Sequence, residues 1–101
     1  MPHRKPMRVR LGKRWFTIRE SGNLNDFGQC EITHRKDGTV KRIIRVATWQ
    51  NEPDELDTWV HEAMHAIWPD KSEAEVAASS AELARLLWRI GYRRTKETND
   101  S

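Results

Sequence analysis

The sequence has a single cysteine, Cys30, so the chain cannot form an internal disulfide bond. It also has no apolar run long enough for the core of a signal peptide or for a membrane span. These two absences argue against a disulfide-stapled secreted domain and against a membrane partner, and we expect the protein in the cytoplasm. Its 101 residues are enough for one domain with one modest core.

The most informative segment that is present is an H-E-x-x-H pentapeptide, formed by His61, Glu62 and His65. On a helix, residues four apart share one face, so the two imidazoles can hold one Zn²⁺ ion while Glu62 lies beside its bound water. The implied chemistry is hydrolysis, with Glu62 as the catalytic general base. The alternative is a pair of ordinary polar histidines on an amphipathic helix. The glutamate at the catalytic offset favours the metal site.

Two helices are predicted around this motif. The segment Asn51–Glu55 indicates a helix start, because it places a proline at the first helical position and acids at the positive end of the helix dipole. The first helix should run from about residue 53 to 68. Ser72 is typical of an N-cap, and it predicts a second helix over about 73–90 that stops at Gly91.

A zinc site needs a third protein ligand, and no further histidine follows the motif. Two glutamates in the second predicted helix are candidates, Glu73 and Glu75. Glu73 lies three residues before Val76 on the apolar stripe, so we expect it to face inward and to complete the metal site. Glu75 belongs to the charged face and can close a capping box with Ser72. It stays open as the alternative third ligand.

Three other residues are candidates for supporting roles. Asp57 lies one turn before the first motif histidine and could accept a hydrogen bond from a ligand imidazole. An ordinary acid in the first turn of a helix is an equal alternative. An oxyanion stabiliser could come from Tyr92 or His34, and the sequence assigns neither.

The first half of the chain is predicted to be β-sheet. An Asp37-Gly38 pair is typical of a hairpin turn. Four short runs favour strands: Arg8–Leu11, Arg14–Ile18, Gln29–Thr33 and Lys41–Thr48. The predicted fold is therefore α+β, with a small antiparallel β-sheet followed by two helices and the motif on the first helix. We expect the segment Arg42–Ala47 to offer its strand edge to an extended peptide or protein substrate.

At the level of motifs, the chain resembles the minimal zincin-fold metallopeptidase-like proteins of bacteriophages. The resemblance extends from about Val9 to Tyr92 and depends on the segment Leu56–Ala66, the pair Ser72-Glu73 and the run Leu83–Trp88. It implies a gluzincin-type site in which the two motif histidines and Glu73 bind zinc and Glu62 is the base. It also implies a small metallopeptidase, in the cytoplasm of the host cell if a phage encodes it.

The alternative is a catalytically inactive zincin-fold module that binds protein or nucleic acid through basic surfaces. Residues 1–19 contain seven Lys or Arg and no acid. The expected organisation is a basic tail over 1–6, one zincin-like domain over 7–92 (sheet 7–50, helices 51–92) and a polar tail over 93–101. The five tryptophans should pack in the core or wall a cleft: Trp15, Trp49, Trp59, Trp68 and Trp88.

Overall fold

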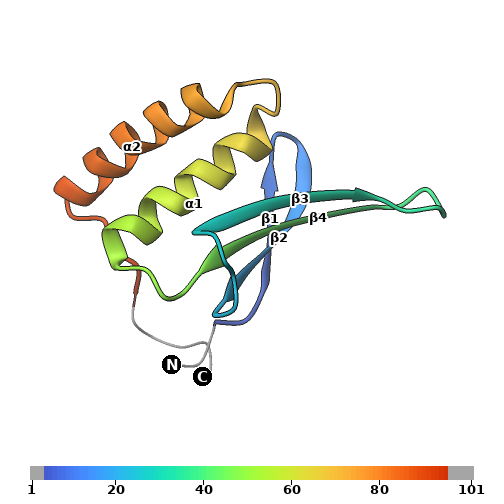
Figure 1. Cartoon of the computed structure of the whole chain (residues 1–101), viewed down its shortest axis with the longest axis horizontal. Helices are drawn as coiled ribbons and strands as arrows, with labels where there is room; N and C mark the ends of the chain where they lie inside the picture. The colour runs from blue at the N-terminus through green and yellow to red at the C-terminus, as the bar shows by residue number, and fades with distance from the viewer. Residues whose placement is uncertain (1–3, 96–101) are drawn as a thin grey trace.

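A computed structural model describes residues 4–95 of the chain. These residues form a four-stranded sheet followed by two helices, as the α+β prediction expects (Figure 1). The elements, in chain order, are β1 (Met7–Leu11), β2 (Arg14–Ser21), β3 (Gly28–His34), β4 (Val40–Ala47), α1 (Glu52–Ile67) and α2 (Glu73–Arg89). Both helices lie on the same side of the sheet, and α2 lies on α1, farther from the strands.

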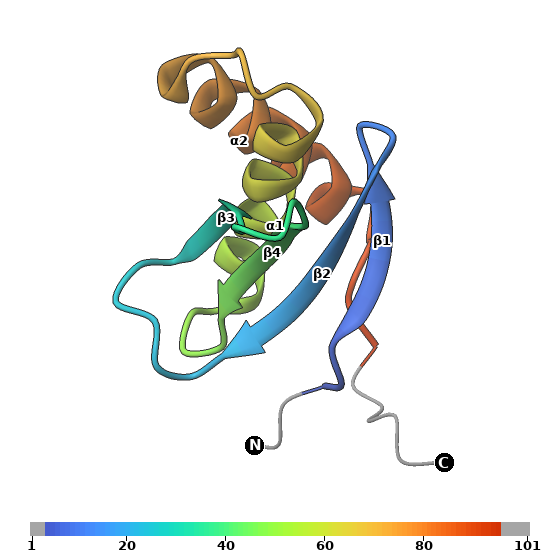
Figure 2. The same cartoon turned by 90° about the vertical axis from the view of Figure 1, so that its right-hand side faces the viewer.

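The sheet is mixed, so the prediction of a wholly antiparallel sheet is wrong. The strand order is β1-β2-β4-β3, which Figure 2 shows from right to left. Strands β2 and β4 are parallel, with Ile18 opposite Ile44, and the other two pairings are antiparallel. The apolar character of β4 explains its central place. Ile43, Ile44, Val46 and Ala47 are all buried, and a strand with so many buried side chains is best accommodated with both of its edges paired.

The central place of β4 also overturns the proposed substrate strand. Arg42–Ala47 belongs to β4, which pairs with β2 on one side and with β3 on the other. It therefore has no free edge to offer a peptide. Within residues 4–95, β1 and β3 are the edge strands, and β3 has the more extensive contact with α1.

The core lies between the sheet and α1. Its fully buried part consists of Phe16 from β2, Ile44 and Val46 from β4, and Ala66 from α1. Strand alternation places these strand residues on the face toward the helix. Trp59 packs against the cluster, whereas Trp15, Trp49 and Trp68 are about half exposed and are not part of the core.

Local capping sets the helix starts, close to the predicted boundaries. The Asn51 side chain accepts a hydrogen bond from the backbone N–H of Asp54 at 2.9 Å, which caps α1. Ser72 and Glu75 form a complete capping box at the start of α2. The last helical residue is Arg89, and Gly91 follows with a φ of 100°, a conformation that glycine adopts without strain.

The second helix is held by α1 alone. Among residues 4–95, no Cα atom of α2 comes within 8 Å of a strand Cα atom. The buried residues of α2 are small or medium in size: Val76, Ser80 and Ala84. No helix in the described part of the chain has the length and apolar character that a membrane crossing requires.

The described ends of the chain are tied to the domain by ion pairs. Arg4 bonds to Glu20 on β2 at 3.0 Å, and Arg94 bonds to Glu20 and, at 2.9 Å, to Glu55 on α1. Burial would raise the pKa of Glu20, but the hydrogen bonds from Arg4 and the charge of Arg94 outweigh it and hold that pKa below its ordinary value. The outer parts of the two expected tails, residues 1–3 and 96–101, lie outside the described residues.

Candidate metal centre

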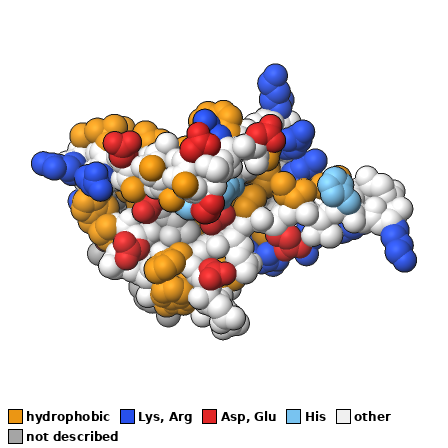
Figure 3. All heavy atoms as spheres, turned by 45° about the horizontal axis from the view of Figure 1, so that its top comes forward, with side chains coloured by type: hydrophobic (Ala, Val, Ile, Leu, Met, Phe, Trp, Pro, Cys, Tyr) orange, Lys and Arg blue, Asp and Glu red, His pale blue; other side chains and the backbone are white. Residues whose placement is uncertain are grey.

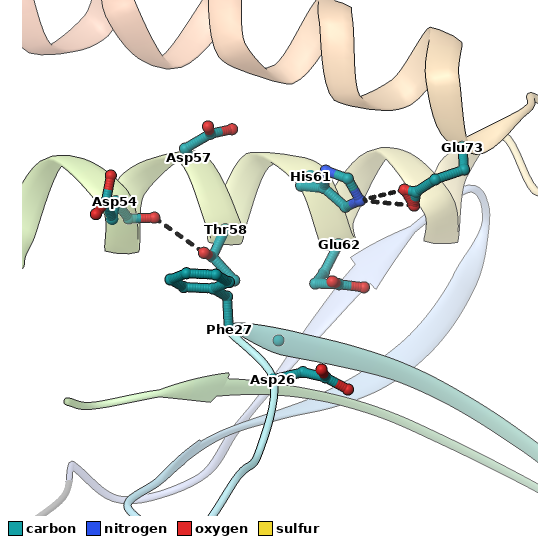
Figure 4. Close-up of a pocket in the computed structure, with 9 residues that line it drawn as sticks. Asp26, Phe27, Asp54, Asp57, Thr58, His61, Glu62 and Glu73 are labelled. Atoms are coloured by element: carbon teal, nitrogen blue, oxygen red, sulfur yellow. Dashed lines mark hydrogen bonds and ion pairs between the residues drawn. The ribbon is translucent and has the colours of Figure 1, made fainter. Parts of the chain in front are cut away.

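Three side chains from the two helices converge on one point. His61 and His65 lie one turn apart near the C-terminal end of α1, and Glu73 is the first residue of α2. The Nε2 atoms of the two histidines are 3.2 Å apart, and each lies 3.0 Å from the Glu73 carboxylate. Figure 4 shows Glu73 reaching toward His61 from the start of α2. The structure therefore brings together the three residues predicted as ligands.

The short connection between the helices produces this convergence. The backbone N–H of Trp68 still bonds to Met64 at 2.8 Å, and Lys71 bonds back to Trp68 at 3.1 Å. The chain thus reverses within a few residues, and the first turn of α2 lies beside the last turn of α1. Glu75, the alternative ligand, is held in the capping box with Ser72 and is not part of the convergent group.

Glu73 differs from the prediction in its burial. It points at the histidines, as its place on the stripe predicts, but 66% of its side chain is exposed. The reason is that α2 packs against a single helix, so its first turn is open to solvent on the other sides. A hydrogen bond from His65 and the neighbouring His61 hold the pKa of Glu73 below its ordinary value, so the carboxylate is ready as an anionic ligand.

The donor geometry fits a zinc ion. Tetrahedral zinc with bonds of about 2.0–2.1 Å separates its ligand atoms by roughly 3.3–3.4 Å. The three donor atoms are already 3.0–3.2 Å apart. Two imidazole nitrogens and a carboxylate oxygen that all face one point repel one another unless a proton or a cation lies among them. Two histidines and one carboxylate form a set that leaves a fourth position open, as catalytic zinc sites do.

Ser80 supports one of the two histidines. Its side chain is almost fully buried on α2, with 1% exposed, and its Oγ lies 3.4 Å from Nδ1 of His61. A proton on Nδ1 of His61 can be donated to this hydroxyl, which leaves the Nε2 lone pair facing the other two donors. The Ser80 hydroxyl itself donates to the Ala77 carbonyl at 3.2 Å. The sequence showed Ser80 only as a small member of the apolar stripe.

Glu62 occupies the wall of a hollow that the metal site also borders. The hollow has a volume of about 390 Å³, and both His61 and Glu73 line it. Glu62 is 8% exposed, and it extends from α1 toward the sheet (Figure 4). Burial raises the pKa of its carboxyl group, although the two histidines oppose the shift. A raised pKa lies closer to neutral pH, and a general base works best when its pKa is near the pH at which the enzyme operates.

A glycine allows the sheet to come this close to Glu62. Gly28 begins β3, and a Cβ atom placed on it would lie 2.5 Å from Cγ2 of Thr58 and 3.1 Å from Cγ of Glu62. Any larger residue would therefore push β3 away from α1 or displace one of these side chains. The sequence contained a signal for this contact, a glycine at the start of a strand, but it could not indicate the partner.

The three residues considered for supporting roles, as a hydrogen-bond partner of a ligand imidazole or as an oxyanion stabiliser, do not lie where those roles require. Asp57 lines the hollow, but its buried Oδ1 has no hydrogen-bond partner within residues 4–95, so it does not orient a ligand imidazole through that atom. His34 is the last residue of β3, at the opposite end of the strand from Gly28, and it is exposed. Tyr92 is 64% exposed and borders a different hollow, between the first turns of α1 and the last turns of α2. Neither residue lines the hollow of Glu62.

Acidic side chains dominate the lining of this hollow. Five carboxylates border it, and no Lys or Arg does. They are Asp26, Asp54, Asp57, Glu62 and Glu73. On the face viewed in Figure 3, red side chains lie close to the pale-blue histidines. The hollow is therefore a region of negative potential that favours cations and basic groups.

No family model, curated protein or solved structure matches this chain. The chemistry of the site therefore has to be inferred from its own geometry. The arrangement can hold a divalent cation with one open position and can present a buried carboxylate beside it.

Proposed function

We propose that this protein is a small zincin-like hydrolase that holds one zinc ion with His61, His65 and Glu73 and cleaves peptide bonds. The observation that carries the proposal is that three donor atoms lie 3.0–3.2 Å apart and that two of the three residues, His61 and Glu73, line the same hollow as Glu62. Two imidazole nitrogens and a carboxylate oxygen that face one point need a proton or a cation among them, and zinc is a cation that this donor set suits.

Zinc bound there would supply a Lewis acid and a water whose pKa is lowered to about 7. In that setting, the Glu62 carboxylate would act as general base toward the water and then as general acid toward the nitrogen of the leaving amine. The burial that raises the pKa of Glu62 helps both steps, because the group must gain and lose a proton near neutral pH. Ser80 keeps the His61 ring in the orientation that the ligand role needs.

The free edge of β3 is the place we propose for the substrate. An extended peptide can add to an unpaired strand edge through main-chain hydrogen bonds. Strand β3 begins at Gly28, in contact range of Glu62, and its only partner among residues 4–95 is β4. A peptide aligned along this edge would pass the hollow. The acidic lining favours peptides that carry Lys or Arg near the scissile bond.

The proposal is tested by metal content and peptide cleavage measured on the same preparations. We expect about one zinc per chain by elemental mass spectrometry. His61→Ala and Glu73→Ala should lose both zinc and cleavage of a mixed peptide library. Glu62→Gln should keep zinc and lose cleavage. Glu75→Gln is the matched control, and it should keep both because Glu75 serves only the capping box.

Two results would contradict the proposal. One is a wild-type protein that takes up no zinc even after reconstitution. The other is cleavage that continues undiminished in Glu62→Gln. Cleavage products that are rich in Lys and Arg at one position would support the acidic hollow as the substrate site.

A catalytically inactive metal-binding module is the second candidate. The observation that favours it is the absence of Arg, Lys and Tyr from the nine residues that line the hollow, so none of them offers an oxyanion donor of those types. Zinc bound without any cleavage, in wild type as in Glu62→Gln, would select this candidate.

A further inference from the structure

The side of the sheet that faces away from the helices is open and basic. Phe16 and Ile44 point toward α1, so strand alternation places their neighbours on the opposite face. A shallow hollow of about 440 Å³ lies there. Ten residues line it, and six of them are basic while none is acidic: Arg8, Arg19, Arg35, Lys41, Arg42 and Arg45.

Most of this positive charge is not neutralised. Glu31 is the one carboxylate that reaches it, and it bonds to Arg45 at 2.6 Å and to Lys41 at 3.7 Å. The other four arginines of the hollow form no ion pair within residues 4–95. Arg19 even lies directly opposite Arg45 in the parallel pairing of β2 with β4. Like charges side by side on a sheet are unfavourable, so the surface is suited to a polyanion.

Two arginines near the end of the described chain behave differently. Arg94 is paired with Glu20 and Glu55, and Arg93 stacks on Trp88 with its guanidinium carbon 3.3 Å from the ring centre. Their charge is engaged within the domain. The hollow on the sheet, by contrast, has four arginines without an ion pair within residues 4–95.

One exposed aromatic side chain lies on the same face. Trp15 borders the hollow with 53% of its surface exposed, although tryptophan is normally buried. The guanidinium carbon of Arg8 lies 5.3 Å from the centre of its ring. This contact holds the indole among the arginines. An aromatic ring interleaved with cations on a flat sheet is the arrangement on which single-stranded bases stack while phosphates pair with arginine.

We propose that this open sheet face binds single-stranded nucleic acid, with Trp15 as a stacking platform and Arg8, Arg19 and Arg35 as phosphate contacts. A duplex suits the face less, since reading a duplex groove requires a protruding helix or ribbon. A lipid surface also suits it less. Trp15 is the only large exposed hydrophobic side chain that lines this hollow, whereas membrane docking needs a broader apolar face. The acidic hollow of the metal site lies on the helix side, so the two sites do not compete.

The test is fluorescence anisotropy with a labelled single strand of about 12 nucleotides, measured on the full chain over a range of salt concentrations. We expect binding that weakens steeply with salt. Reversing two charges with Arg8→Glu/Arg19→Glu should lower affinity at least about tenfold. The slope of the logarithm of the binding constant against the logarithm of the salt concentration should become less negative by about 0.7 for each phosphate that is no longer neutralised. Trp15→Ala should lower affinity about fivefold or more, and Trp15→Phe should largely restore it.

Matched controls are available on α2 and at the end of α1. Arg85→Glu/Arg89→Glu makes the same charge change on exposed residues of α2, and Trp68→Ala removes another half-exposed indole. We expect each to change affinity by less than about twofold. Arg35→Glu, in the turn after β3, is a further variant if the strand substitutions disturb folding as judged by circular dichroism.

Four outcomes would overturn the proposal. The first is no salt-dependent binding by the wild-type chain. The second is an equal loss of affinity in the α2 control and in the sheet variant. The third is binding to a duplex as tight as to the single strand. The fourth is retention on phosphatidylserine vesicles without oligonucleotide binding. None of these measurements needs zinc or Glu62, so the result stands independently of the proposed hydrolase activity.

Discussion

The hydroxyl of Ser80, on α2, lies 3.4 Å from Nδ1 of His61, on α1. This contact joins the two helices at the candidate metal centre, and a proton donated from Nδ1 of His61 to this hydroxyl would leave Nε2 free to bind a metal. Outer partners of this kind are worth about 10–100-fold in metal affinity in known zinc sites.

We therefore expect Ser80→Ala to weaken zinc binding by about tenfold, with little change in the free energy of unfolding of the metal-free protein. A competition titration against a chromophoric chelator measures the affinity. Ser79→Ala, the neighbouring serine on α2, is the control and should leave zinc affinity unchanged. Equal affinities in all three proteins would refute a role for the Ser80 hydroxyl.

Gly28 gives a prediction about the approach of β3 to α1. Gly28→Ala should lower the free energy of unfolding by about 1–3 kcal/mol, because the new Cβ would lie 2.5 Å from Cγ2 of Thr58. Thr58→Ser removes that methyl group and keeps the hydroxyl that bonds to Gln50 and Asp54. The double variant Gly28→Ala/Thr58→Ser should be more stable than the sum of the single changes predicts. Strict additivity in urea denaturation would count against this contact.

Zinc should stabilise the fold, because its ligands come from both helices. At a free concentration about 100 times the dissociation constant, the gain is about 2.7 kcal/mol, which corresponds to a rise in Tm of roughly 10–20 °C for a domain of this size. Differential scanning calorimetry with zinc and with a chelator measures the shift. Glu62→Gln should retain it. A shift of the same size in Glu73→Ala would show that zinc acts elsewhere.

Glu31 gives a prediction about pH. Hydrogen bonds from Arg45 and Thr33 lower the pKa of its carboxyl group from 4.5 to about 2. Because the folded-state pKa is depressed, the stabilisation is complete above the unfolded value of 4.5 and is lost as the pH falls toward about 2. Glu31→Gln should thus unfold at a lower urea concentration than wild type at neutral pH, and the difference should vanish near pH 2.

The control for the pH experiment is Glu82→Gln, an exposed glutamate of α2 with no ion pair within residues 4–95. It should shift the urea midpoint little at either pH. A Glu31→Gln deficit of the same size at both pH values would mean that the side chain acts through packing and not through its charge.

The helices could be predicted from the sequence because their signals are local. Asn51 and Ser72 cap the helices within one turn of their own positions, and Gly91 follows the second helix directly. The pairing of β2 with β4 could not be predicted in the same way. It joins segments separated by the whole of β3, and no short-range pattern distinguishes a parallel from an antiparallel partner. The buried apolar residues of β4 are typical of a central strand, whereas the prediction gave this strand a free edge.

The candidate site was predictable where periodicity governs it. The two histidines share one face of α1 because they are four residues apart, and the direction of Glu73 follows from its position three residues before Val76 on the apolar stripe. The exposure of Glu73 depends on which elements pack against the outer side of α2, and the sequence of α2 does not indicate them. Ser80 escaped notice because a serine within an apolar stripe usually means only a tight helix contact, and its partner lies on the other helix.

The attachment of α2 to α1 alone has a consequence for the timing of metal exchange. Two of the candidate donors belong to a helix that is packed on the sheet, and the third belongs to a helix that packs on α1 and on no strand. Detachment of α2 would remove the third donor without unpairing a strand, so release of a bound zinc ion would be coupled to that detachment. Amide hydrogens of α2 should exchange faster than those of the sheet in the metal-free chain, and added zinc should slow exchange in α2 most.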